Sequence, residues 1–292
     1  MSQICKIVIL GGDSRQFYMA KHLHHLNYPV AVYGLDIKDE SQTIYEASSL
    51  KEALSFGNII VCPVPFTKNS KDIYTRKEKA DLTITELMLY LNENHTLFGG
   101  CICDLVKEYC DTKHIPFYDF MEVESVTIAN AIATAEGALI EAMLASPIVL
   151  HKSKCLILGF GRCAKILADK LKGIGADVTI AARSKEALTF ADAYSYHTIS
   201  ISNLTKCISE FSFIFNSIPS MVLDAAELSY VSKEATIIDI ASAPGGINYD
   251  YCDQMHLQAK LCLGLPGKYA PQTSAQILNE ALLDWLSCLP SS

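Results

Sequence analysis

The sequence predicts an α/β protein with two doubly wound parallel-sheet domains joined by a long helix. Short apolar runs that end at glycine occur twice, at 4–10 before Gly11-Gly12 and at 154–158 before Gly159-Phe160-Gly161. Each run leads into a helical pattern, and apolar strands that alternate with helices form parallel sheets covered on both faces. The 292 residues are enough for two such domains, each with its own core.

The same alternation predicts the individual elements of both Rossmann-like halves. In the first half we expect strands at 4–10, 29–33, 58–62, 95–98 and 114–118, and helices at 14–26, 48–55, 82–92 and 103–111. In the second half we expect strands near 154–158, 177–181, 196–199, 212–216, 236–240 and 260–263, with a first helix at 161–174.

The segment 122–145 is alanine-rich, contains no proline and stops before Ser146-Pro147, so it predicts the helix that joins the domains. A second helical pattern covers 272–289. We expect an N-terminal, substrate-side domain at 1–121, completed by the C-terminal helix of 272–292. The dinucleotide-binding domain is then 122–271, including the joining helix.

The composition excludes several classes of protein. Half of the residues are apolar and the net charge is −8, which argues against nucleic-acid binding because such proteins need a basic surface. The 11 cysteines contain no Cys-x-x-Cys pair, and we see no signal peptide, so we expect a reduced, cytoplasmic protein. The apolar run 127–150 contains Asn130, Glu136 and Glu141, which argues against a membrane span. His22, His24 and His25 have no suitably spaced carboxylate, so we expect no metal site.

The second glycine turn carries a dinucleotide fingerprint, Gly159-x-Gly161-x-x-Ala164. Gly159 permits the tight turn, Gly161 lets the backbone approach a pyrophosphate, and Ala164 lets helix and strand pack closely. The amides at the start of the following helix then face the phosphates. The alternative is a Rossmann-like turn that binds nothing.

The end of the next strand favours NADP over NAD. An NAD enzyme usually has an acidic residue there, but this chain has Ala181-Ala182-Arg183-Ser184-Lys185. Arg183 can stack on adenine and pair with a 2′-phosphate, and Ser184 can donate a hydrogen bond. The alternative is that Arg183 only starts a solvated helix.

Two further strand ends lie on the cofactor side of this sheet. Asn216 and Pro219 follow the fourth strand of the domain, where dinucleotide enzymes often cover the nicotinamide ribose, and Ala241 follows the fifth. Ligands of parallel sheets bind at the carboxyl ends of the strands. Each segment taken alone can also be a simple turn.

The first domain offers Arg15 as a substrate-binding residue. Gly11-Gly12-Asp13 resembles a phosphate loop but lacks the third glycine, so we expect no second nucleotide there. Arg15 at the start of a helix suits a substrate carboxylate, unless it pairs with a local acid. Lys268, after the last strand, is a second candidate cation, or else is solvated.

The joining helix carries polar residues that need partners. Asn130 and Thr134 are four residues apart and share a face, with Glu136 near that face but not squarely on it. A ligand is one explanation and core hydrogen bonds to loops are the other. No histidine occupies the acid/base position of 2-hydroxy-acid dehydrogenases, which favours chemistry with little proton transfer.

These residues together resemble the family formed by the A subunit of dipicolinate synthase from spore-forming bacteria. The resemblance covers nearly the whole chain and rests on the following motifs: Gly11-Gly12-Asp13-x-Arg15, Asn130-Ala131-x-x-Thr134-Ala135-Glu136-Gly137, Gly159-x-Gly161-Arg162, Ala181 with Arg183, Asn216-x-x-Pro219, Asp239-x-Ala241-Ser242-x-Pro244-Gly245-Gly246, and Leu265-Pro266-Gly267-Lys268-x-Ala270-Pro271. Arg162 joins the cofactor-binding set through this match.

The resemblance implies oxidation of a dihydrodipicolinate-level intermediate to pyridine-2,6-dicarboxylate, with NADP as acceptor. It also implies a flavoprotein-like partner, the B subunit of dipicolinate synthase, and the mother-cell cytoplasm during sporulation. We also expect a homo-oligomer. If the substrate still carries a 4-hydroxyl, Glu136 is the candidate acid for loss of water. The alternatives are a non-catalytic NADP-binding regulatory subunit, or a dehydrogenase of another amino or 2-oxo acid.

Overall fold

The computed structural model describes residues 5–36, 44–77 and 79–288. Its contacts divide the chain into unit 1, residues 1–127 with 270–292, and unit 2, residues 128–269. Residue 4 of the first predicted strand and residues 289–292 of the predicted C-terminal helix lie outside the described residues. The predicted domain limits stay a prediction, because contacts alone do not show that a unit folds independently.

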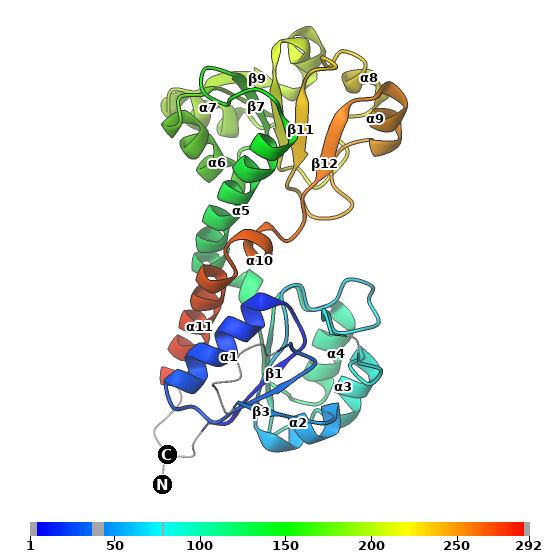
Figure 1. Cartoon of the computed structure of the whole chain (residues 1–292), viewed down its shortest axis with the longest axis vertical. Coiled ribbons are helices and arrows are strands. Elements are labelled where there is room, and N and C mark those ends of the chain that lie inside the picture. The colour runs from blue at the N-terminus through cyan, green and yellow to red at the C-terminus, as the bar shows by residue number, and fades with distance from the viewer. Residues whose placement is uncertain (1–4, 37–43, 78, 289–292) are drawn as a thin grey trace. The chain divides into compact units, whose positions relative to one another are not determined.

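Unit 1 contains a six-stranded parallel sheet in the order β3-β2-β1-β4-β5-β6 (Figure 1). Its strands are β1 (Ile7–Leu10), β2 (Val30–Tyr33), β3 (Tyr45–Glu46), β4 (Ile59–Val61), β5 (Thr96–Gly99) and β6 (Phe117–Asp119). Its helices are α1 (Ser14–His25), α2 (Leu50–Phe56), α3 (Ile84–Tyr90), α4 (Asp104–Thr112), a 3-10 turn at Phe120–Glu122, and α11 (Pro271–Ser287). The pattern missed β3 because both of its residues are exposed, so no apolar run marks it.

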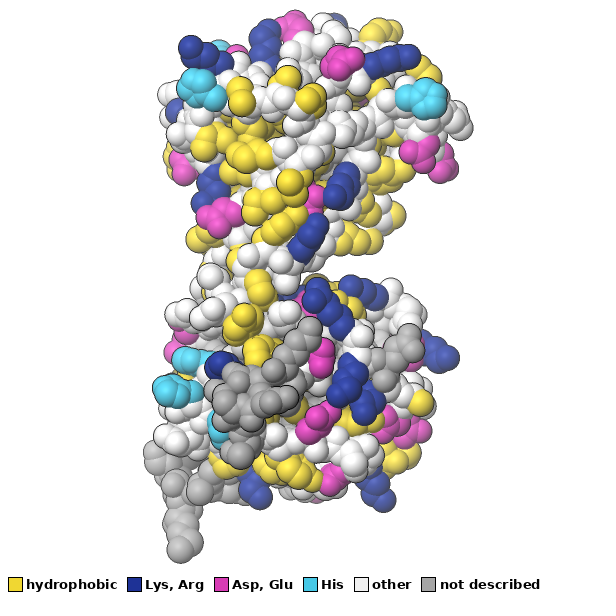
Figure 2. All heavy atoms as spheres, in the orientation of Figure 1, with side chains coloured by type: hydrophobic (Ala, Val, Ile, Leu, Met, Phe, Trp, Pro, Cys, Tyr) yellow, Lys and Arg dark blue, Asp and Glu magenta, His cyan; other side chains and the backbone are white. Residues whose placement is uncertain are grey.

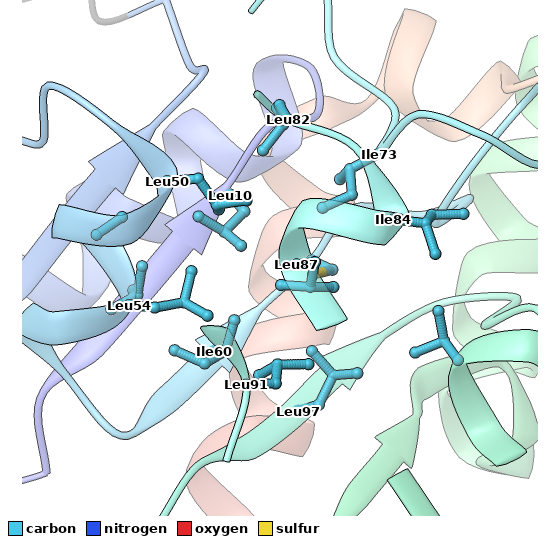
Figure 3. Packing of buried hydrophobic residues seen from close by; sticks show 14 of the residues in the cluster. Leu10, Leu50, Leu54, Ile60, Ile73, Leu82, Ile84, Leu87, Leu91 and Leu97 are labelled. Atoms are coloured by element: carbon cyan, nitrogen blue, oxygen red, sulfur yellow. The ribbon is translucent and has the colours of Figure 1, made fainter. Parts of the chain in front are cut away.

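Successive residues of β1 enter opposite cores. Val8 and Leu10 pack with α2, α3 and α4, and Figure 3 shows this core around Leu10, Leu50 and Leu87. Ile7 and Ile9 pack with α1 and α11 on the other face. A strand that is covered on both faces must be apolar at every position, which explains the continuous runs in the sequence.

Unit 2 repeats this architecture in the order β12-β11-β10-β7-β8-β9. Its strands are β7 (Lys154–Leu158), β8 (Asp177–Ala182), β9 (His197–Ser200), β10 (Phe213–Asn216), β11 (Thr236–Asp239) and β12 (Gln258–Leu261). Its helices are α6 (Arg162–Gly173), α7 (Lys185–Ala193), α8 (Ala225–Leu228), α9 (Tyr249–Met255) and α10 (Leu265–Tyr269), with 3-10 turns at Ile201–Lys206 and Ile208–Glu210. Cores from α5, α6 and α7 cover one face of the sheet, and the 3-10 turns with α8 and α9 cover the other.

The strand order of both sheets is that of doubly wound dinucleotide-binding folds, which confirms the predicted fold class. The order reverses between β1 and β4 in unit 1 and between β7 and β10 in unit 2. Loops after these strands therefore lie at the crevice where such folds bind ligands. The last strand begins two residues earlier than predicted, because Gln258 and Lys260 on this edge strand are exposed and do not read as an apolar run.

The predicted long helix is present as α5 (Glu124–Ala145), which runs from unit 1 into unit 2. Ala135, Ala138 and Ala142 line its core side. Among the described residues, α5 alone is long and apolar enough to cross a membrane by length and composition. Its buried alanine side packs against the sheet of unit 2, which is the behaviour of a core helix.

Candidate functional site

The turn between β7 and α6 has room for a ligand at one glycine and not at the other. Gly159 has φ +94°, and a Cβ there would lie 2.6 Å from the Ser217 hydroxyl oxygen, so backbone and packing both require glycine. Gly161 has an ordinary φ of −83°, and a Cβ there would meet nothing within 4 Å. Neither strain nor packing explains Gly161, whereas the close approach of a pyrophosphate does.

The start of α6 leaves its amide donors open. Gly161 is the N-cap residue and makes no side-chain cap hydrogen bond, and the first turn contains no acidic residue. Ala164, fully buried, allows α6 to pack closely in the core below β7. Unpaired amides and the helix dipole favour an anion at this end. Arg162, the first residue of the helix, is exposed beside it.

The end of β8 presents cations and no acid. Ala181 and Ala182 are buried, and Arg183, Ser184 and Lys185 are exposed. Ser184 caps α7 by accepting a hydrogen bond of 3.0 Å from the Ala187 amide, which leaves its hydroxyl proton for a ligand. Within the described part of the chain, no ion pair occupies Arg183. This set suits a 2′-phosphate.

The side chain of Asn216 is occupied by its own turn. It is fully buried, and its amide nitrogen donates to the Ile218 carbonyl at 3.0 Å and to Asp239 Oδ1 at 2.9 Å. Its Oδ1 accepts the Ile218 amide at 3.0 Å. Asn216 therefore shapes the segment that ends at the exposed Pro219, and only the surface of that segment is left for a cofactor.

Asp239 organises the neighbouring loops, a role that the sequence analysis did not assign. It is fully buried and accepts, besides Asn216, the amides of Ala241 at 2.9 Å and Gly246 at 2.8 Å, and the Tyr249 hydroxyl at 2.9 Å. Burial and this hydrogen bond raise the pKa of Tyr249. A charged residue at the end of an apolar strand was the available signal. Ala241 is thereby held in a fixed backbone position.

The glycine turn of unit 1 is closed by the chain itself. The Gly12 amide donates to the Tyr74 carbonyl at 2.7 Å, and the Arg76 amide donates to the Gly12 carbonyl at 3.1 Å. A Cβ on Gly11 would lie 2.6 Å from the Tyr74 carbonyl oxygen. The space over this turn that a phosphate would need is filled, in contrast to the space over Gly161.

Arg15 is buried and paired with Asp13. Arg15 Nε and Nη2 each lie 2.9 Å from an Asp13 oxygen, and Nη2 also donates to the Val64 carbonyl. Burial acts to raise the pKa of Asp13, but the hydrogen bonds and charge of Arg15 outweigh it and lower that pKa. The local ion pair is thus present. Nη1 donates to no other described residue, so part of the guanidinium stays available to a ligand.

The three candidate residues of α5 do not lie together. Thr134 Oγ1 donates to the Asn130 carbonyl at 3.1 Å, and both residues are half-buried on one face. Burial raises the pKa of the Cys163 thiol in the first turn of α6, while Arg162 and the Thr134 hydroxyl lower it, so this face of α5 adjoins the cofactor helix. Glu136, roughly 160° around the helix from Thr134, is exposed and pairs with Lys170 of α6 at 2.8 Å.

Lys268 belongs to a cluster around Glu141 that the sequence analysis missed. Glu141 is 2% exposed and accepts Lys260 Nζ at 2.6 Å, Lys268 Nζ at 2.5 Å and the Tyr269 hydroxyl at 2.8 Å. The two ammonium groups are half-exposed. A lone glutamate in the most apolar stretch of α5 was the signal. Among the described residues, no group of His, Cys, Asp and Glu is arranged to hold a metal.

Comparison with known proteins places this geometry in context. The family model for the N-terminal domain of the dipicolinate synthase A subunit matches residues 6–121, and that for shikimate / quinate 5-dehydrogenase matches 142–253. The A subunit of dipicolinate synthase from Bacillus subtilis (strain 168) is 28% identical over 95% of this chain and 94% of its own length.

The chain is a relative of the dipicolinate synthase A subunit. The crystal structure of the Bacillus subtilis protein superposes with a TM-score of 0.85 at 25% identity, covering 98% of this chain and 97% of the other. The corresponding structure from Bacillus halodurans gives 0.88 at 24% identity, covering 99% and 100%, and shows the shared fold. The resemblance to this family that the motifs indicated is confirmed. The dehydrogenase match on unit 2 supports an NAD(P)-binding oxidoreductase fold.

Proposed function

We propose that this chain is the oxidoreductase subunit of a dipicolinate synthase. It removes hydride from a dihydrodipicolinate-level ring and passes it to NADP, acting with the flavoprotein-like B subunit in the mother-cell cytoplasm during sporulation. The open α6 terminus at Gly161, in a chain related to the dipicolinate synthase A subunit over nearly its full length, is the observation that carries the proposal.

The cofactor residues of the proposal follow the geometry of unit 2. The amides at the start of α6 hold the pyrophosphate, with Arg162 beside them. Arg183 and Ser184 hold the 2′-phosphate at the end of β8. The turn from Asn216 to Pro219 and the backbone at Ala241 border the nicotinamide end. When bound, the nicotinamide ring supplies the hydride acceptor.

Replacing Arg183 tests the preference for NADP. Arg183→Ala should weaken NADPH binding about ten- to a hundredfold, because a charge-assisted hydrogen bond contributes about 1.5–3 kcal/mol. NADH binding should change little. Calorimetric titration of both cofactors measures this, with Arg76→Ala, an exposed arginine of unit 1, as the control. Equal losses for NADPH and NADH would remove Arg183 from the 2′-phosphate site.

The substrate of the proposal is a dianion, so its carboxylates need cations. Arg15 offers Nη1, and Asp13 holds the guanidinium in place through a two-point ion pair. Lys268 is the second proposed cation, fixed by Glu141. A positioned ring loses far less freedom on the way to hydride transfer.

The proposed reaction needs little from the protein as a base. A dihydropyridine ring loses one hydride to the cofactor and one proton to solvent, and aromatisation drives both. Asn130 and Thr134 orient the reacting ring from α5. Glu136 points away from them and pairs with Lys170, so the proposal assigns it no proton transfer. As the acid for a 4-hydroxylated ring, Glu136 stays a prediction that Glu136→Gln would test.

Arg15→Lys separates substrate binding from cofactor binding. Lysine keeps the charge but cannot bind Asp13 in two places and a carboxylate as well. We expect KM for the dicarboxylate to rise about tenfold, the loss of one charge-assisted hydrogen bond, with an unchanged Kd for NADPH. A KM equal to that of the native protein would take Arg15 out of the substrate site.

A coupled assay tests the reaction itself. The dihydrodipicolinate-level intermediate is generated enzymatically, this protein and NADP+ are added with and without the flavoprotein-like partner, and dipicolinate and NADPH are followed together. We expect both products in equal amounts. NADPH binding without turnover in either mixture would favour a regulatory role, and turnover with other amino or 2-oxo acids alone would favour a different dehydrogenase.

A further inference from the structure

The outer face of α5 in unit 2 is apolar and exposed. Ile128, Ile132, Ile140 and Leu144 are 45%, 46%, 36% and 76% exposed, and Met143 adds to the same face. Ile148 and Val149, which follow the helix, extend the surface, and Figure 2 shows hydrophobic side chains gathered over α5 on the face in view. We call Ile128, Ile132, Glu136, Ile140, Met143, Leu144, Ile148 and Val149 the α5 ridge.

Core packing does not account for the α5 ridge. The buried side of α5 is made of alanines and Glu141, so the helix is apolar on its inner and outer sides alike. Only 44% of its most apolar 18-residue stretch is buried. A helix that is apolar all round is normally buried all round, and a contiguous exposed apolar surface marks an interaction site.

The α5 ridge is complementary to itself. Ile128, Ile132, Glu136, Ile140 and Leu144 follow one another at intervals of four, with the charged residue at the centre. Such a row is the ridge that packs between the corresponding rows of a second helix, the commonest packing class of globular proteins. In an antiparallel pair of α5 helices, Ile132 opposes Ile140 of a second copy and Ile128 opposes its Leu144.

The charges at the centre favour the same partner. Glu136 Oε1 binds Lys170 of its own chain at 2.8 Å, and among the described residues Oε2 has no partner. Across a two-fold axis at Glu136, Lys170 of each copy reaches the free oxygen of the other. A contact in which the same patch serves both copies is the usual arrangement of homodimers. The ridge carries no other charge, which suits two chains that each have a net charge of −8.

We propose that the α5 ridge is a homodimer interface in which two copies of this chain pair through antiparallel α5 helices about a two-fold axis at Glu136. The proposal does not depend on the proposed function, because it rests on exposure, spacing and charge alone.

Sedimentation velocity of the full chain tests this interface. The native protein should have twice the chain mass of 32.1 kDa, and the double variant Ile140→Glu/Leu144→Glu should have the single mass, with an unchanged circular dichroism spectrum. Leu89→Glu, a 68% exposed leucine of α3, is the matched control and should remain dimeric.

A charge exchange tests the two-fold axis. Glu136→Lys and Lys170→Glu should each raise the dimer Kd at least tenfold, and the double exchange should restore it. A native protein that is monomeric at about 100 μM, a Kd weaker than about −5.5 kcal/mol, would overturn the proposal. So would a double glutamate variant that stays dimeric, or one that stays dimeric while losing its flavoprotein-like partner or binding to phosphatidylcholine vesicles.

Discussion

Gly161 and Gly12 show how the same residue type serves two ends. A Cβ on Gly12 would lie 2.2 Å from Gln16 Oε1, and φ there is +94°, so the native chain itself requires glycine. Nothing in the chain requires it at Gly161, where φ is ordinary and the space is open. A glycine that the folded protein does not need is best explained by what the protein binds.

Gly161→Ala should separate folding from cofactor binding. The added Cβ meets no protein atom, so we expect a stability loss below about 1 kcal/mol, the cost of alanine at an N-cap. The same Cβ occupies the position that the pyrophosphate needs, so NADPH affinity should fall at least tenfold. Urea unfolding and calorimetric titration measure the two effects. Gly173→Ala, also open within 4 Å, is the control, and an equal effect of the two variants on binding would contradict the assignment.

At the scale of secondary-structure elements, Glu141 connects three of them. It receives hydrogen bonds from Lys260 of β12 and from Lys268 and Tyr269 of α10, and it extends from α5. A Cβ on Gly137 would lie 2.8 Å from Leu265 Cβ, so α5 and α10 also touch directly one turn earlier. Burial acts to raise the pKa of Glu141, but the bonds from Lys260, Lys268 and Tyr269 outweigh it and lower the pKa to about 2.

This cluster predicts a specific acid sensitivity. A carboxyl whose folded pKa is depressed stabilises the fold above its unfolded pKa, and that stability is lost as the pH falls from about 4.5 toward about 2. Because both lysines are half-exposed, we expect the loss to be on the order of 1–2 kcal/mol. Urea unfolding between pH 5 and pH 2.5 should show a smaller slope in Glu141→Gln than in the native chain. Parallel curves would mean that the cluster does not couple protonation to folding.

At the scale of the molecule, each unit has its own pair of cores on the two faces of its own sheet. Only α5 and the step from Tyr269 to Ala270 carry the chain between the units. Two cores joined by few connections tend to unfold separately. Differential scanning calorimetry should therefore resolve two transitions.

NADPH should move only the transition that belongs to unit 2. A ligand at 100 times its Kd adds about 2.7 kcal/mol to the unit that binds it. NADH at the same concentration should shift this transition less. One transition that moves as a whole with NADPH would contradict both the independence of the units and the predicted division of the chain.

The local sequence determined the fold class, because strands covered on both faces must be apolar throughout and glycines must stand at the tight turns that follow. The runs before Gly11 and Gly159 were sufficient to identify both sheets, and the fingerprint at Gly161 identified the cofactor turn. The motifs were also sufficient to indicate the relationship to the dipicolinate synthase A subunit.

Only the tertiary structure decided which polar side chains are already in use. Arg15 is paired with Asp13, Asn216 with Asp239, Glu136 with Lys170 and Lys268 with Glu141. Asp13 lies two residues from Arg15, whereas the other three partners are 23, 34 and 127 residues distant along the chain. Periodicity and motif spacing describe neighbours within a few turns of helix or strand, so pairs of this separation become visible only when the sheets bring their strand ends together.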